Sequence, residues 1–209
     1  ERSYYENLEK HQLTVDRAFP PEIEAGVLAF CHCYYLRMPS EEKRIELLQR
    51  TSALSKGMLS IENILAAVTA EQNDYLARME IPEGTALNKA LRENIFATIP
   101  CIVNKIPIFI CGKPGCSKSL AIQLIFANLR GQKSPDAFFR TLPELINVSF
   151  QGSDSCTSEG ILKVFERARK YLTTNTKEQK QEGKEILPVV IFDEIGLAEI
   201  SKHNPLKVL

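Results

Sequence analysis

A stretch rich in glycine and serine, residues 112–119, carries residue types that bind phosphate groups. It reads Gly-Lys-Pro-Gly-Cys-Ser-Lys-Ser and matches G-x-x-x-x-G-K-[ST], except that Ser117 occupies the position of the second glycine. In such a loop successive backbone N–H groups form a concave anion site, and the following helix N-terminus adds further donors. The stretch therefore predicts a site for a nucleoside triphosphate, although an ordinary turn that precedes a lysine would have the same composition.

The residues of this loop have different expected roles. Lys118 is expected to contact the outer phosphates, and the hydroxyl of Ser119 is expected to bind Mg²⁺. Gly112 and Gly115 allow backbone angles that other residues resist, and serine at position 117 is a small, mild replacement. The residues expected to contact nucleotide are Gly112, Pro114, Gly115, Cys116, Ser117, Lys118, Ser119 and Leu120.

The segments on either side of the loop predict the elements that position it. Residues 106–111 are rich in Ile and Phe, which is typical of a buried parallel strand. Residues 118–129 predict a helix, because one face at helical spacing is apolar and consists of Ala121, Leu124, Ile125 and Leu129. This strand–loop–helix order is the context in which phosphate-binding loops occur.

A second candidate group is the acidic pair Asp193-Glu194, which follows the apolar and β-branched residues 187–192. Acids at the carboxyl end of a parallel strand lie where open α/β sheets bind ligands. Asp193 is suited to hold Mg²⁺ through its water shell, and Glu194 to polarise a water for attack on a γ-phosphate. The simpler alternative for the pair is a solvated strand end.

Alternating strands and helices between these two groups indicate an α/β fold. Residues 145–150 predict a strand, and Thr157 or Ser158 can cap the helix that follows. That helix is expected to bury one face, made of Ile161, Phe165, Ala168 and Leu172. Residues 173–184 are polar and charged, and they are expected to form a surface loop.

The first part of the chain predicts a separate helical segment. Ser40 and Ser60 are expected helix caps. The expected helices of this segment cover residues 22–38, 41–54 and 61–79, and a further helix over most of 86–103 is expected to lead into the strand before the loop. Proline and glycine in residues 81–84 mark the best domain boundary, which divides the chain into 1–82 and 83–209.

Composition excludes several classes of protein. Twenty-six basic and 26 acidic residues give zero formal charge, which does not favour a nucleic-acid binder. No stretch has the length of a transmembrane helix. The six cysteines lack paired C-x-x-C sets, and Cys31-His32-Cys33 lies in an apolar run, which favours buried core thiols over zinc and a reducing, cytoplasmic setting.

Several of these stretches together resemble the mysterin family of giant AAA+ proteins, which are also RING-finger ubiquitin ligases. The phosphate loop is similar to a family loop that also has serine in place of the second glycine. The other similar stretches are residues 90–96 (Ala-Leu-Arg-Glu-Asn-Ile-Phe), 148–151, 157–161, 193–199 and 205–207. The resemblance covers about residues 86–209 and extends only loosely to the helical start.

The resemblance implies a P-loop AAA+ core with a three-layer parallel sheet, truncated after the strand that ends at Asp193. It implies ATP and Mg²⁺ as cofactors, with Lys118 and Ser119 on nucleotide and metal, Asp193 on Mg²⁺ and Glu194 as the hydrolytic residue. Residues 1–82 would be the lid of a preceding module or an N-terminal extension. Neighbouring AAA+ modules in a longer chain, the ubiquitin machinery and a cytoplasmic, lipid-droplet-linked location are also implied, whereas the paired Cys/His zinc ligands of a RING domain are not in this chain.

Three functions remain open on the sequence. The first is an ATP-hydrolysing AAA+ module, completed by an arginine from a neighbouring module. The second is a structural or regulatory scaffold module that binds ATP with little or no turnover. The third, a GTP-binding switch, is disfavoured by Asp193-Glu194.

Overall fold

The computed structural model describes residues 18–182 and 185–208 of the chain. Two compact units make up the chain, Glu1–Ile125 and Phe126–Leu209. The boundary between the units falls within helix α6, Lys118–Asn128, which follows the glycine- and serine-rich loop.

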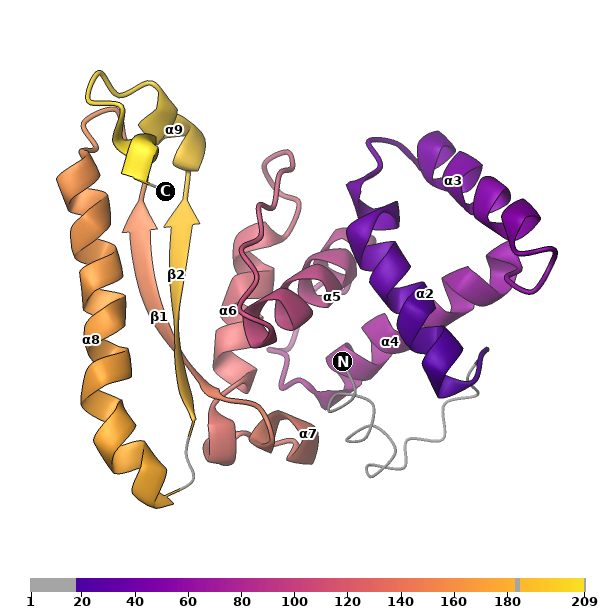
Figure 1. The fold of residues 1–209 in the computed structure, drawn as a ribbon, viewed down its shortest axis with the longest axis horizontal. Coiled ribbons are helices and arrows are strands. Elements are labelled where there is room, and N and C mark those ends of the chain that lie inside the picture. Colours follow the sequence, from indigo (N-terminus) through magenta and orange to yellow (C-terminus); the bar gives the residue numbers. More distant parts are fainter. Residues whose placement is uncertain (1–17, 183–184, 209) are drawn as a thin grey trace. The chain divides into compact units, whose positions relative to one another are not determined.

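The described part of the first unit is helical (Figure 1). Its elements are α2 (Pro21–Cys33), the 3₁₀ helix η1 (Tyr35–Arg37), α3 (Glu41–Leu54), α4 (Ile61–Arg78), α5 (Lys89–Val103) and the start of α6. Both predicted caps are confirmed: the Ser40 hydroxyl accepts a hydrogen bond from the Lys43 N–H at 3.3 Å, and that of Ser60 from Asn63 at 3.1 Å. Local capping chemistry therefore sets the starts of α3 and α4.

The core of the first unit lies among α2, α3, α4 and α5. Its largest fully buried side chains are Leu48, Ile64, Tyr75, Leu91, Ile95, Phe96 and Ile99. Cys31 is also fully buried, which confirms the prediction of a core thiol, and burial raises its pKa to about 12. Cys33 is exposed, so that prediction is wrong for Cys33.

The burial of His32 predicts that the stability of the first unit depends on pH. The imidazole packs against the Phe96 ring with centroids 4.1 Å apart, and burial lowers its pKa from 6.5 to about 4. Between these two values the unfolded chain binds the extra proton, so stability decreases as the pH falls through this range. We expect a loss of about 2 kcal/mol of unfolding free energy on going from about pH 7 to about pH 5.

Urea denaturation at both pH values measures this effect in the wild type and two variants. His32→Gln should flatten the dependence, whereas His203→Gln, which removes an exposed histidine of the second unit, should leave it unchanged. Equal pH dependence in the wild type and His32→Gln would contradict the role of His32.

The predicted strand at residues 106–111 is wrong, because no strand is described there or elsewhere among residues 18–125. Ile106 and Phe109 are 56% and 75% exposed, and the Ile106 N–H donates back to the Cys101 carbonyl at the end of α5. A strand requires a ladder partner for its N–H and C=O groups, and apolar composition does not supply one.

The second unit contains a two-stranded parallel sheet with a long helix along it (Figure 1). Strands β1 (Glu144–Gln151) and β2 (Ile186–Asp193) pair in register from Glu144↔Ile186 to Gln151↔Asp193. The remaining elements are η2 (Gly131–Lys133), α7 (Ala137–Arg140), α8 (Ser158–Glu182), α9 (Ile195–Glu199) and η3 (Pro205–Val208). The strands predicted at residues 145–150 and 187–192 and the α/β class are confirmed, while the larger three-layer sheet stays a prediction.

Helix α8 covers the sheet with a face that differs from the predicted one. Val164 and Ala168 are buried against Val148 of β1, and Ile161 is fully buried. The prediction is correct for Ile161 and Ala168, but Phe165 and Leu172 are 41% and 48% exposed. Thr157 is the cap, because its hydroxyl accepts from the Gly160 N–H at 3.2 Å.

The predicted surface loop at residues 173–184 is also wrong as far as Glu182, where α8 ends. Lysine, glutamate and glutamine dominate this segment, and all three have good helix propensity. Polar composition alone therefore did not distinguish a helix from a loop.

Candidate nucleotide-binding site

The phosphate loop adopts two left-handed backbone conformations. Gly115 has φ 80° and Ser117 has φ 54°. Glycine accepts such angles without cost, whereas a residue with a Cβ is disfavoured by about 1 kcal/mol. Ser117 thus has the left-handed conformation that suits the glycine usually found at this position of the motif. Serine in place of glycine therefore changes the residue but keeps the shape of the backbone.

Helix α6 begins directly after this loop. The Ala121 N–H donates to the Ser117 carbonyl at 3.0 Å, which makes Lys118 and Ser119 the first residues of the helix. The predicted apolar face is confirmed, since each of its members is at most 3% exposed: Ala121, Leu124, Ile125 and Leu129. The N-terminal turn of a firmly packed helix thus follows the loop, as anion binding at a helix N-terminus requires.

The ammonium of Lys118 is directed at the loop itself. Its Nζ donates to the carbonyls of Gly112 at 2.8 Å and Lys113 at 3.0 Å. The Lys118 side chain therefore spans the loop. If it contacted a phosphate, charged phosphate oxygens would replace these two carbonyl oxygens as its hydrogen-bond acceptors. Ser119 is exposed at the same end of α6.

Helix α5 contacts the loop through two asparagines. The side-chain amide of Asn94 donates to the Cys116 carbonyl at 2.8 Å, and that of Asn88 donates to the Ser117 hydroxyl at 3.2 Å. Neither asparagine was predicted as a site residue, because neither belongs to the loop motif. The position of Asn88 one residue before the start of α5 was a capping signal that could have drawn attention to it.

The acidic pair lies at the carboxyl end of β2, in the second unit. Asp193 and Glu194 are both exposed, and the Asp193 carboxylate accepts a hydrogen bond from the Glu194 N–H at 3.0 Å. Glu194 has φ 52°, a left-handed conformation that turns the chain from β2 into α9. The pair therefore projects from a sharp strand-to-helix turn.

Gly152 supports this turn from the end of β1. Its N–H donates to the Asp193 carbonyl at 2.8 Å and extends the β1–β2 ladder by one bond. A Cβ built on Gly152 would lie 2.2 Å from the Glu194 carbonyl oxygen, so only glycine fits. Gly152 was not predicted either, although a glycine two residues after the predicted strand 145–150 is a signal of close backbone approach.

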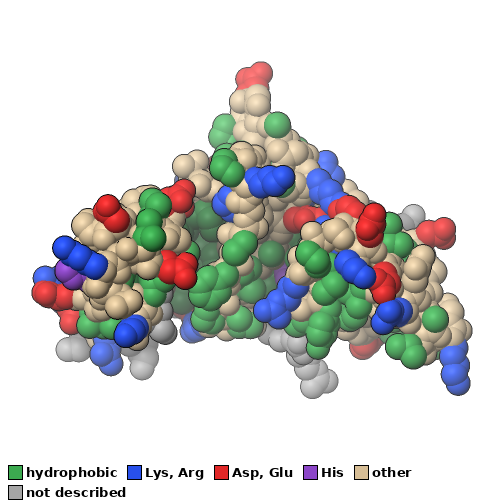
Figure 2. Space-filling model, turned by 90° about the horizontal axis from the view of Figure 1, so that it is seen from above, with side chains coloured by type: hydrophobic (Ala, Val, Ile, Leu, Met, Phe, Trp, Pro, Cys, Tyr) green, Lys and Arg blue, Asp and Glu red, His purple; other side chains and the backbone are tan. Residues whose placement is uncertain are grey.

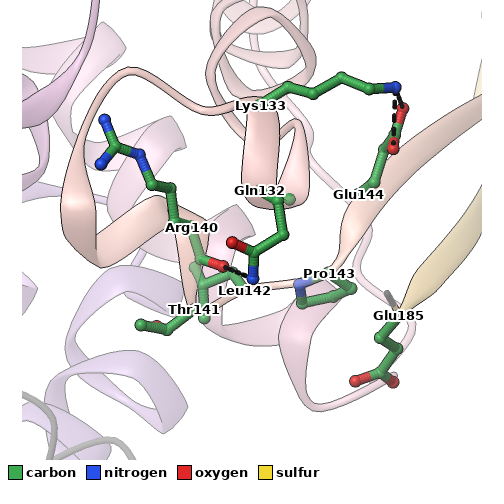
Figure 3. A pocket seen from close by; sticks show the side chains of 9 residues that line it. Gln132, Lys133, Arg140, Thr141, Leu142, Pro143, Glu144 and Glu185 are labelled. Carbon is green, nitrogen blue, oxygen red and sulfur yellow. Dashed lines mark hydrogen bonds and ion pairs between the residues drawn. The ribbon is translucent and has the colours of Figure 1, made fainter. Parts of the chain in front are cut away.

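A cavity at the other end of the strands is a weaker candidate. It has a volume of about 180 Å³ and is lined by η2, residues 140–144 and Glu185, where β1 and β2 begin (Figure 3). Its basic side chains are engaged, since Lys133 pairs with Glu144 at 3.3 Å and the Arg140 guanidinium donates to two backbone carbonyls. Parallel sheets bind ligands at their carboxyl ends, which argues against this cavity as the nucleotide site.

One face of the molecule shows no large cluster of a single charge. Basic and acidic side chains are interspersed over the face in Figure 2, with apolar side chains between them. The structure places the loop residues together in the first unit and the acidic pair in the second. Contact of the loop with nucleotide, and of Ser119 and Asp193 with one Mg²⁺, therefore stay predictions.

The sequence of the chain is similar to a known domain family and to several named proteins. The family described as RNF213 AAA domain matches residues 84–209. The chain is 36% identical over 192 residues to E3 ubiquitin-protein ligase RNF213 of Mus musculus, and 32% identical over 189 residues to that of Homo sapiens. It is 37% identical over 184 residues to E3 ubiquitin-protein ligase rnf213-beta of Danio rerio. These matches cover 88–90% of this chain but only about 4% of each relative.

Proposed function

We propose, from the premise that the chain belongs to the RNF213 AAA domain family, that it is an AAA+ module that binds and hydrolyses ATP. The observation that carries the proposal is the backbone of the phosphate loop, in which Gly115 and Ser117 are left-handed and Lys118 opens α6. A loop of this shape before a helix is suited to a polyphosphate. Membership of this family confirms the resemblance that the sequence indicated over about residues 86–209.

The chemistry of the two halves fits ATP and Mg²⁺. A serine hydroxyl and a carboxylate are the hard oxygen ligands that Mg²⁺ accepts, and Ser119 and Asp193 supply them. Mg²⁺ would neutralise charge on the phosphates when it is bound. In this proposal Lys118 holds the outer phosphates, and Glu194 orients the attacking water and accepts its proton.

A second candidate function is a scaffold module that binds ATP and turns it over little. Two observations favour it. Ser117 has a left-handed conformation that costs energy for a residue with a Cβ, and the Lys118 ammonium already donates hydrogen bonds to two carbonyls of the loop. Turnover separates the two functions, because both require ATP binding and only the first requires Glu194.

The place of the chain in a larger protein is also a proposal. The relatives named as E3 ubiquitin-protein ligases are much longer, so we infer a module within a ubiquitin ligase of the cytoplasm, with neighbouring AAA+ modules that complete its site. Residues 18–182 and 185–208 contain no helix that is long and apolar enough to cross a membrane.

Removal of the loop lysine tests the proposal. In the intact protein, Lys118→Ala should weaken ATP binding by about tenfold to a hundredfold, because a hydrogen-bonded charge on phosphate is lost. Lys113→Ala removes an equal charge from an exposed loop side chain and should bind ATP nearly as the wild type does. Titration with ATP, and with GTP in parallel, measures these affinities.

Two results would overturn the ATP site. One is a wild-type protein that binds no ATP, and the other is equal affinity in the wild type and Lys118→Ala. Tighter binding of GTP than of ATP would replace the ATPase proposal with the nucleotide switch.

A further inference from the structure

Two asparagines at the start of α5 hold the phosphate loop at its most unusual residue. We propose that Asn94 and Asn88 are positioning residues, which keep the loop N–H groups arranged for phosphate although a serine replaces the usual glycine. The inference deepens the proposed function and rests on it, because an arrangement for phosphate matters only if the loop binds nucleotide. Each asparagine acts on a different part of the loop.

Asn94 acts on the peptide group between Cys116 and Ser117. Its amide nitrogen lies 2.8 Å from the Cys116 carbonyl oxygen and binds it across 22 residues of sequence. In a trans peptide the carbonyl and the following N–H point in opposite directions, and no cis peptide is described. With the carbonyl drawn toward α5, the Ser117 N–H is directed away from α5, as a donor to a bound phosphate has to be.

Asn88 acts on the side chain of Ser117. Its carboxamide oxygen accepts the Leu91 N–H at 2.8 Å as the cap of α5, so the orientation of the amide is fixed. The amide nitrogen then donates to the Ser117 hydroxyl at 3.2 Å. This bond favours the left-handed conformation of Ser117, which glycine would adopt unaided.

Ion pairs with α3 also fix the start of α5. Arg44 forms a bidentate pair with Glu93, with N–O distances of 2.6 and 3.2 Å, and Lys89 pairs with Glu41. The Arg44 and Glu93 side chains are only 12% and 20% exposed, which makes their geometry firmer than that of a surface pair. Glu93 directly precedes Asn94, so these ion pairs fix the helix turn from which Asn94 contacts the loop.

Substitutions at Asn94 separate positioning from general stability. Asn94→Leu keeps the approximate volume and loses the donor, and we expect ATP binding about tenfold weaker with little change in Tm. Asn94→Gln keeps an amide donor and should recover part of the affinity. Asn104→Leu is the matched control, because its amide also donates to a backbone carbonyl at 2.8 Å, from the opposite end of α5.

A double-mutant cycle tests Asn88 against Ser117 directly. Asn88→Ser keeps a capping hydroxyl but is too short to keep the amide contact, and it should weaken ATP binding about threefold to tenfold in the Ser117 background. In the Ser117→Gly background the same change should have almost no effect, since glycine needs no partner.

The outcomes are distinguishable from those of the proposed function. If the wild type binds ATP and Lys118→Ala does not, but Asn94→Leu binds like Asn104→Leu, the positioning role of Asn94 is refuted and the ATP site stands. Equal effects of Asn88→Ser in both backgrounds refute the role of Asn88. A wild type that binds no ATP refutes the proposed function and this inference with it.

Discussion

Replacement of Glu194 with glutamine should lower ATP turnover by about a hundredfold to ten-thousandfold and leave ATP affinity near the wild-type value. Glutamine keeps the size of the side chain and the left-handed turn between β2 and α9, but it cannot accept the proton of an attacking water. The loss is therefore confined to the chemical step, which is the pattern expected of a residue that acts in the transition state.

Steady-state release of phosphate and equilibrium binding of ATP, measured on the same preparations, separate these two quantities. Glu199→Gln is the matched control. Glu199 is exposed at the end of α9, the short helix that begins directly after Glu194, and its substitution removes the same charge. Turnover in Glu199→Gln should stay near the wild-type rate. Turnover that is measurable in the wild type and unchanged in Glu194→Gln would exclude Glu194 as the catalytic residue.

A wild type that binds ATP but shows turnover no greater than that of Glu194→Gln would favour the scaffold module instead. The left-handed Ser117 would then be read as part of a loop that retains nucleotide. The same pair of measurements thus decides between the two candidate functions.

Features determined by neighbouring residues were predictable from the sequence. The caps Ser40 and Ser60 lie one residue before the helices they start, and the buried face of α6 repeats at helical spacing. The β-branched run that ends at Asp193 is equally local, and β2 forms where it predicts. Ser117 belongs with these features, because the motif itself assigns glycine-like angles to that position.

Features that depend on distant residues were not predictable in the same way. Residues 106–111 have the composition of a strand, yet strand formation depends on a partner that this composition cannot specify. The contacts of Asn88 and Asn94 with the loop join segments 29 and 22 residues apart. The need for glycine at position 152 likewise arises from a backbone segment that follows a long helix.

Gly152→Ala should be among the most damaging small substitutions in the second unit. The added Cβ would lie 2.2 Å from the carbonyl oxygen and 2.9 Å from the carbonyl carbon of Glu194, and both are backbone atoms that cannot rotate away. The ends of β1 and β2 must therefore separate, which also strains the 2.8 Å bond from the Gly152 N–H to the Asp193 carbonyl. We expect a loss of about 3 kcal/mol of unfolding free energy, from overpacking together with a weakened hydrogen bond.

Chemical denaturation of Gly152→Ala beside Gly160→Ala checks this prediction. A Cβ on Gly160 would meet its nearest neighbour at an ordinary 3.5 Å in the first turn of α8, so alanine there should be neutral or stabilise by up to about 1 kcal/mol. The two substitutions add the same methyl group, and only the first displaces the turn that carries Asp193 and Glu194. Turnover should accordingly fall in Gly152→Ala even at temperatures where the variant is folded, whereas a stable and fully active Gly152→Ala would show that the strand ends are not held as closely as this contact requires.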